Sequence, residues 1–408
     1  MYFRKPIIVA LFSKALSLLA TLLIFSSIMA GQQAQATFSA LRSRAEAASH
    51  ENRLNEAARL YGQALRLRPG WADGWWSLGT IEYDRDQYLQ SASAFQRLLT
   101  LQPSNGTAHA MIGLCQFELG EDNLALKNLL AAERLGVVNN QDLRKVAVYH
   151  LGVLQLRKKL YGSALKTFRN LAQDDVRTDQ VALGLAMSLL MVQPSAAPAE
   201  NTVGLAVMLG IGQAEILSTQ RKPEEARQRY LSLLQQYPDY PGLHFAYGLF
   251  LVGEEPEEAI EQLQAELHIN PEQFVALLQI AAILVDEDPS QAIEYIKKAL
   301  AINPGSPYGH FLLGQCYLKT ENAAAALPEL EQARRSMQNQ PQVYFALGNT
   351  YAKLGRKQEA AQARAEFRRL QARTGTSDAD AYGQQQRLPI EQIAPQSKDT
   401  KNRDSNSR

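Results

Sequence analysis

The chain has 408 residues, of which 46% are apolar and 20% are charged. This composition is typical of a folded protein larger than one small domain, and it excludes a wholly disordered chain. The formal net charge is only +1, which argues against a nucleic-acid partner or a polybasic membrane surface, because both need concentrated positive charge.

The N-terminus has the pattern of a secretory signal peptide. Three basic residues flank the start of an apolar run over residues 15–30, and Ala34-x-Ala36 supplies the small residues of a cleavage site. We therefore predict a signal peptide over residues 1–36 and export to the periplasm or the medium. The alternative is an uncleaved inner-membrane anchor over residues 7–30, since this stretch is nearly long enough to span a bilayer.

Prolines reveal an internal repeat further along the chain. Pro69 and Pro103 are 34 residues apart, and Pro238, Pro271 and Pro304 follow one another at intervals of 33. A small residue lies twelve residues before each proline, and a second small residue lies about twelve residues earlier. Apolar residues recur at helical spacing between them. This pattern therefore predicts that each unit forms two helices joined by a short turn, and that proline ends the second helix.

These units resemble the tetratricopeptide repeat, whose pattern over about 34 residues is W-x2-L-G-x2-Y, then A-x3-F, then P. Both parts of the pattern occur here, for example as Trp75-x2-Leu78-Gly79 and Ala164-x3-Phe168. The last unit departs from it with Ala360-x3-Arg364. The resemblance covers most of residues 38–370.

The resemblance implies an all-α fold, a right-handed superhelix of about nine helix-turn-helix units. A small residue on the first helix lets the paired helices approach closely, and a large residue on the second fills the space between them. One pair cannot bury its apolar face alone, so the units must stack into a solenoid. We place the unit starts near Ser39, Ala72, Gly106, Lys145, Val207, Pro241, Phe274, Pro307 and Pro341.

The register of the repeat breaks between residues 174 and 202. The segment Gln-Pro-Ser-Ala-Ala-Pro-Ala-Glu at residues 193–200 cannot continue a helix and replaces the expected second one. The polar composition near the C-terminus predicts a disordered tail. The predicted parts are an N-terminal array over 37–173, an irregular unit over 174–206, a C-terminal array over 207–373 and the tail over 374–408.

Motifs for chemistry are missing from the sequence. It contains no H-E-x-x-H, no G-x-S-x-G and no Walker A loop. The six histidines are scattered, and His109, His244 and His310 occupy the repeat position of a packing tryptophan, so we predict no metal site, no cofactor and no enzyme. Cys115 and Cys316 lie several units apart, so we predict buried packing residues without a disulfide between them.

Known tetratricopeptide arrays imply a concave groove, lined by the first helices, that binds a segment of a partner protein. In this register, groove positions 5 and 12 give an aromatic series of Trp76, Tyr83, Phe117, Tyr149, Phe245, Phe311 and Phe345. Exposed aromatic patches commonly mark contact sites, so we predict that these rings bind a protein or peptide. The alternative is that neighbouring helices already cover them.

The sequence therefore predicts an exported interaction scaffold or adaptor with a protein or peptide partner. One alternative is a membrane-tethered envelope assembly factor, if the N-terminal segment is retained. Another is a carrier or enzyme in the irregular unit, which is disfavoured because residues 174–206 contain no His and no Cys. A carboxylate clamp for an acidic C-terminus is also disfavoured, since only Asn349 matches the Lys and Asn that it needs.

Overall fold

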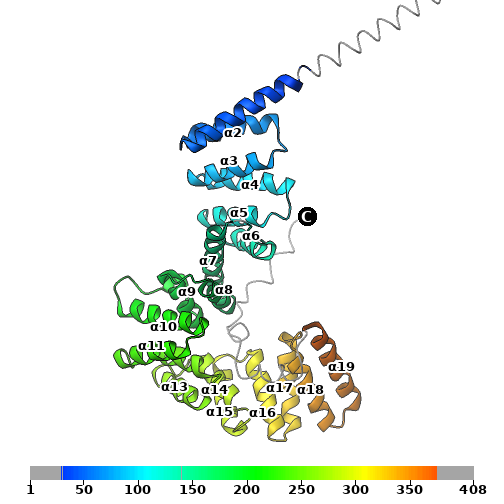
Figure 1. Cartoon of the computed structure of the whole chain (residues 1–408). Helices are drawn as coiled ribbons and strands as arrows, with labels where there is room; N and C mark the ends of the chain where they lie inside the picture. The colour runs from blue at the N-terminus through cyan, green and yellow to red at the C-terminus, as the bar shows by residue number, and fades with distance from the viewer. Residues whose placement is uncertain (1–28, 30, 139, 375–408) are drawn as a thin grey trace, which may run out of the picture. The chain divides into compact units, whose positions relative to one another are not determined.

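A computed structural model describes residues 29, 31–138 and 140–374, and in this part of the chain every regular element is a helix (Figure 1). The apolar core of the predicted signal peptide and residues 375–408 of the predicted tail lie outside the described residues. Ala34 and Ala36, which form the predicted cleavage site, are exposed on a helix over residues 31–50. None of the described helices combines the length and the apolar character that crossing a bilayer requires.

The chain divides into two compact units, one ending at Leu151 and the other starting at Gly152. After the helix over residues 31–50, the first unit contains α2 (Leu54–Leu67), α3 (Ala72–Asp84), α4 (Tyr88–Leu101), α5 (Gly106–Glu118) and α6 (Asp122–Leu135). The boundary falls inside α7 (Gln141–Arg157).

The second unit holds the remaining helices (Figure 1). The first of them are α8 (Tyr161–Gln173), α9 (Asp179–Leu189), the short 3-10 helix η1 (Pro194–Ala196), α10 (Val203–Thr219) and α11 (Pro223–Gln236). They are followed by α12 (Leu243–Leu251), α13 (Pro256–Ile269), α14 (Phe274–Leu284), α15 (Pro289–Ile302), α16 (Pro307–Lys319), α17 (Ala323–Ser336), α18 (Pro341–Lys353) and α19 (Lys357–Thr374).

The helices form pairs that stack on one another in chain order. Within the units α3 packs on α4, α5 on α6, α10 on α11, and so on to α18 on α19. Second helices also pack on the next first helix, as α4 does on α5, α13 on α14, α15 on α16 and α17 on α18. Several predicted unit starts coincide with the first residue of a helix, namely Ala72, Gly106, Phe274, Pro307 and Pro341. The predicted all-α repeat of helix pairs is therefore confirmed.

The repeating prolines end the second helices. Pro69, Pro103, Pro238, Pro271 and Pro304 each follow the last residue of a helix by two positions, as the ends of α2, α4, α11, α13 and α15 show. Proline disfavours the continuation of a helix, because it lacks an amide hydrogen and clashes with the preceding turn. The regular proline spacing thus marks where these five second helices stop.

Close contact between paired helices depends on the small residue of the first helix. A Cβ atom added to Gly79 would lie 2.7 Å from the ring of Phe95, and one added to Gly314 would lie 2.5 Å from Leu330 Cγ. Non-bonded carbon atoms prefer separations of 3.5–4.0 Å. The large residue of the second helix therefore fills the space that glycine leaves, as the repeat pattern predicts.

The same packing continues through α9, the helix that lies outside the pairs. A Cβ atom at either Gly152 or Gly184 would lie 2.6 Å from the ring of Phe168, so this one ring fills the space left by two glycines. Next along the chain, a Cβ at Gly212 would lie 1.8 Å from the carbonyl oxygen of Ala182. The backbones of α9 and α10 therefore touch, which only glycine allows at this position.

Both cysteines are fully buried and free. The Cys115 thiol donates a hydrogen bond to Ser91 Oγ at 3.2 Å, and Ser91 donates to the carbonyl oxygen of Gly79 at 2.8 Å. Burial raises the pKa of the Cys115 thiol and raises that of Cys316 to about 12. Both residues therefore pack as neutral thiols, in agreement with their predicted role.

Candidate functional site

The seven predicted groove rings differ widely in exposure. Phe245 and Phe311 are buried, at 0% and 3% exposure, whereas Phe345 is 38% exposed. Trp76, Tyr83, Phe117 and Tyr149 are partly buried. A direct contact between these rings and a partner stays a prediction. Phe245 and Phe311 match the alternative, in which neighbouring helices cover the rings.

The environment of the first helices explains this difference. First helices of neighbouring repeats contact one another, since α10 touches α12, α14 touches α16 and α16 touches α18. The helices α12 and α16, which carry the two buried phenylalanines, are each followed by further helix pairs. Phe345 lies on α18, in the last described pair, and its ring contacts Phe367 of α19 at 5.5 Å between centroids. No further pair follows α19 in the described residues, so one side of α18 lacks the cover that inner repeats have.

In the first unit, the predicted rings lie in two places. Phe117 and Tyr149 both contact the ring of His150, at centroid distances of 4.6 and 5.4 Å. Trp76 packs edge-on against Phe95 of α4 at 5.2 Å, and Tyr83 packs against Tyr88 at 5.4 Å. The structure therefore brings Phe117 and Tyr149 together, while Trp76 and Tyr83 pack on the second helix of their own pair.

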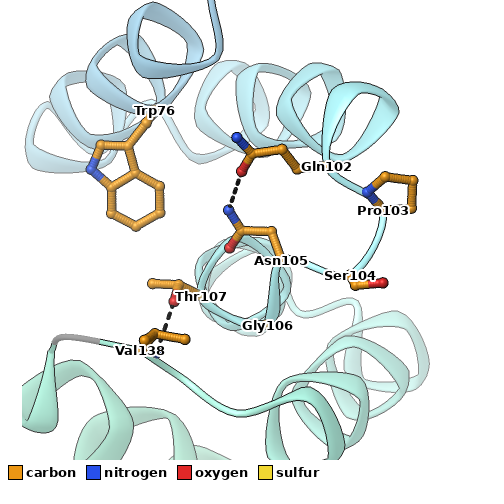
Figure 2. Close-up of a pocket in the computed structure, with 8 residues that line it drawn as sticks. All are labelled: Trp76, Gln102, Pro103, Ser104, Asn105, Gly106, Thr107 and Val138. Carbon is orange, nitrogen blue, oxygen red and sulfur yellow. Dashed lines mark hydrogen bonds between the residues drawn. The ribbon is translucent and has the colours of Figure 1, made fainter.

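Trp76 also lines a pocket of about 600 Å³ (Figure 2). The other lining residues are 102–107, which form the turn from α4 into α5, and Val138, which lies just before α7. Figure 2 shows the indole of Trp76 projecting from its helix toward Thr107 and Val138. We call this site the Trp76 pocket. Its volume lies within the 300–1,000 Å³ typical of ligand-binding pockets.

Local sequence holds the walls of the Trp76 pocket in place. Asn105 caps α5, because its Oδ1 accepts a hydrogen bond from the backbone N–H of Ala108 at 2.9 Å. The Asn105 amide donates to Gln102 Oε1 at 2.8 Å, and the N–H of Val138 donates to Thr107 Oγ1 at 3.1 Å (Figure 2). Two of the three chain segments that line the pocket, residues 102–107 and Val138, are thus tied together.

The lining of the Trp76 pocket contains no ionisable side chain. Its apolar surface comes from the indole, from Pro103 and from Val138, which is 64% exposed. Its polar groups are amides and hydroxyls. The Thr107 hydroxyl accepts from Val138, and Gln102 accepts through its oxygen. Among the described residues no acceptor faces the Thr107 hydroxyl hydrogen or the Gln102 NH2 group, so both can donate. The pocket therefore offers an aromatic wall and neutral hydrogen-bond donors.

A second pocket, of about 390 Å³, lies among α17, α18 and α19. Its charged lining residues are already paired, since Arg334 lies 2.7 Å from Glu331 and Arg369, just outside the lining, lies 2.5 Å from Glu366. Tyr351 donates to Glu331, and burial together with this carboxylate raises the pKa of Tyr351 to about 12. These ion pairs are internal contacts of the last repeats, so this pocket is a weaker candidate for a binding site.

Histidines at the tryptophan position of the repeat take part in a recurring hydrogen bond. Trp75 Nε1 donates to the carbonyl oxygen of Pro69 at 2.8 Å, and the Nε2 atoms of His244 and His310 lie 2.9 Å from the carbonyl oxygens of Pro238 and Pro304. These rings therefore bridge a first helix to the turn before it. In the part of the chain that the structure describes, no three His, Cys, Asp or Glu side chains come together as a metal site would require.

Periodicity alone did not point to two features of the structure. No sequence pattern marked residues 102–107 or Val138 as part of a site, although Pro103-Ser104-Asn105-Gly106 is a strong turn signal. The second feature is Glu266, which is 1% exposed and accepts hydrogen bonds from the backbone N–H groups of Gly242 and Phe245 at the start of α12. A buried glutamate in a second helix has no signal in the repeat pattern.

Comparison with protein families finds the tetratricopeptide repeat over more than half of the chain. The matches cover residues 42–105, 77–136, 211–274, 284–347 and 341–363. Comparison with curated proteins finds no match.

Solved structures with a similar fold share little sequence with this chain. MamA from Desulfovibrio magneticus RS-1, from its residue 41 onward, is 18% identical, with 42% of this chain and 97% of that chain covered and a TM-score of 0.37. A tetratricopeptide repeat protein from Parabacteroides merdae ATCC 43184 is 14% identical, with 77% and 98% covered and a TM-score of 0.31. PilW, described as a type IV pilus biogenesis factor, is 18% identical, with 59% and 96% covered and a TM-score of 0.38.

Proposed function

The chain belongs to the tetratricopeptide repeat family, and from that premise we propose that it is an interaction scaffold or adaptor that binds a segment of a partner protein. Stacked helix pairs give a long surface on which side chains can change without loss of the fold. Such surfaces serve recognition, because their side chains can vary with the partner.

The observation that carries this proposal is the Trp76 pocket. Among the predicted groove residues, Trp76 is partly exposed and lines a cavity that residues 102–107 and Val138 complete. Aromatic residues in such pockets commonly supply a large share of binding energy. We propose the Trp76 pocket as the principal contact in the first unit, and the exposed ring of Phe345 as a contact in the second.

Site-specific photo-crosslinking tests the proposed function. A benzophenone amino acid placed at Val138, on the rim of the pocket, is expected to capture one specific protein in the native cell fraction. The same group at Leu89, which is 67% exposed outside the pocket, is the matched control. Adding Trp76→Ala should abolish capture from Val138, while circular dichroism shows an unchanged helical fold. If Val138 and Leu89 give the same products, or Trp76→Ala changes nothing, the proposed function is wrong.

The cellular location is a separate proposal that depends on the N-terminus. We propose export, because basic residues, an apolar run and a small-residue site follow one another there. N-terminal sequencing of the purified protein separates the two forms. A new N-terminus after Ala36 supports a cleaved, exported adaptor, whereas a retained Met1 or Tyr2 supports the alternative, a membrane-tethered assembly factor.

A further inference from the structure

We propose that the Trp76 pocket binds an uncharged, proline-containing segment of the partner in an extended conformation. This inference rests on the proposed function, because it names the chemistry of the segment that the scaffold would bind. Three properties of the pocket support it: a fixed aromatic wall, a lining without charge, and neutral hydrogen-bond donors.

The aromatic wall is the indole of Trp76. Its edge-on contact with Phe95, at 5.2 Å and an interplanar angle of 66°, holds the ring against α4. Figure 2 shows that the indole projects toward Thr107 and Val138. A fixed indole costs little conformational entropy on binding and offers a flat apolar surface. The pyrrolidine ring of proline is a rigid apolar group that packs well on such a surface.

The lack of charge selects against ionic segments. None of the lining residues, which are Trp76, residues 102–107 and Val138, has an ionisable side chain. A lysine, arginine, aspartate or glutamate side chain that entered the pocket would find no opposite charge in the lining and would gain no ion pair there. The occupant that best complements this lining is therefore uncharged.

The hydrogen-bonding groups favour proline over other uncharged residues. The Gln102 NH2 group and the Thr107 hydroxyl hydrogen remain after the contacts with Asn105 and Val138. A polyproline II segment has no internal hydrogen bonds, so its carbonyl groups are free to accept from such donors. Proline also has no N–H group, so a proline in the pocket needs no acceptor there. Donors on the protein and acceptors on the peptide are thus matched.

The test is a selection of binding peptides from a phage-displayed library of random nonapeptides. The target is the protein without the predicted signal peptide, residues 1–36. Binders to the wild type are compared with binders to Trp76→Ala, and Leu89→Ala, outside the pocket, is the matched control. We expect the peptides that depend on Trp76 to be enriched in proline and depleted in charged residues. A synthetic peptide from this set should lose at least about tenfold in affinity with Trp76→Ala and little with Trp76→Phe or Leu89→Ala.

Affinity should also change little between about 50 and 300 mM salt, because no charges pair. Three results would overturn the inference. The peptides whose binding requires Trp76 could lack proline enrichment, they could be rich in charged residues, or no peptide could require Trp76 at all. Binding of a neutral oligosaccharide that requires Trp76, in the absence of peptide binding, would overturn it in favour of a glycan. If crosslinking from Val138 succeeds while these selections fail, the scaffold function stands and the proline inference falls. If the crosslinking and the peptide selections both fail, the scaffold function and the proline inference are both wrong.

Discussion

The side chain of Arg364 lies against Gly348, where a Cβ on the glycine would be 3.2 Å from the arginine Cγ. The equivalent contact one repeat earlier, between Gly314 and Leu330, would be 2.5 Å. The last described pair therefore leaves more room at the crossing of its two helices, and its neighbour is a flexible side chain. This explains how the final unit tolerates a departure from the repeat pattern.

Alanine at these two glycines should have opposite effects. Gly314→Ala forces Leu330 away and should destabilise the protein by about 1–3 kcal/mol through overpacking. At Gly348, Arg364 can move, so the better helix propensity of alanine should leave stability unchanged or raise it by up to about 1 kcal/mol. Urea unfolding followed by circular dichroism measures both. Equal losses at the two sites would contradict the packing account.

Phe245 and Phe345 occupy the same repeat position but should serve different purposes. Phe245 is fully buried, so Phe245→Ala should cost about 3–5 kcal/mol by leaving a cavity. Phe345 is 38% exposed, so Phe345→Ala should cost much less and should instead weaken partner capture. Thermal unfolding and crosslinking of the two variants separate these effects. A large stability loss at Phe345 with unchanged capture would show that it is a packing residue.

The buried carboxyl of Glu266 should make stability depend on pH. Burial raises its pKa above the ordinary value of 4.5, although hydrogen bonds from Gly242 and Phe245 oppose this shift. The folded protein therefore holds the proton more tightly than the unfolded chain does. The contribution of Glu266 to the free energy of unfolding is greatest below about pH 4.5 and decreases as the pH rises through the raised pKa.

Glu266→Gln should remove this dependence. Relative to the variant, the wild type should lose stability as the pH increases from about 4 to 7, which urea midpoints at four pH values would show. Glu261→Gln, an exposed change on the same helix, is the matched control and should preserve the wild-type slope. Parallel curves for the wild type and Glu266→Gln would rule out a raised pKa.

The ion pair between Arg169 and Glu215 joins α8 to α10 across 2.8 Å, and Glu215 also accepts from the hydroxyl of Tyr230 at 3.3 Å. Glu215 is 3% exposed, while the Arg169 side chain is 44% exposed. Arg169→Ala should cost about 1–3 kcal/mol, because it leaves a buried carboxylate without its partner. Adding Glu215→Gln should recover part of this loss in a double-mutant cycle. Additive losses would show that the two side chains are not coupled.

The sequence predicted the helices and the crossings between them because both depend on short-range spacing. A glycine, the large residue of the second helix and the proline that ends it recur at fixed offsets, and each has one steric role. Unit starts such as Ala72 and Pro307 therefore coincide with helix starts. The departure of the last unit from the repeat pattern was also visible in the sequence, because Arg364 stands where the pattern has a large apolar residue.

The candidate site could be predicted only in part. Repeat position identified Trp76, but the exposure of a first-helix ring depends on how the neighbouring first helices cover it, and this coverage differs between Phe245 and Phe345. Spacing along one helix holds no information about that coverage. The remaining pocket walls come from a turn and from Val138, whose places follow from tertiary packing.

The ring of Phe168, which fills the space beside both Gly152 and Gly184, has an evolutionary consequence. A substitution at one glycine cannot be accommodated by trimming the ring without opening a void at the other, so three positions are bound to change together. Among natural homologues, we expect a smaller residue at 168 to be accompanied by larger residues at both glycine positions. The unpaired helix α9 thus couples the variation of residues on three successive helices of the repeat.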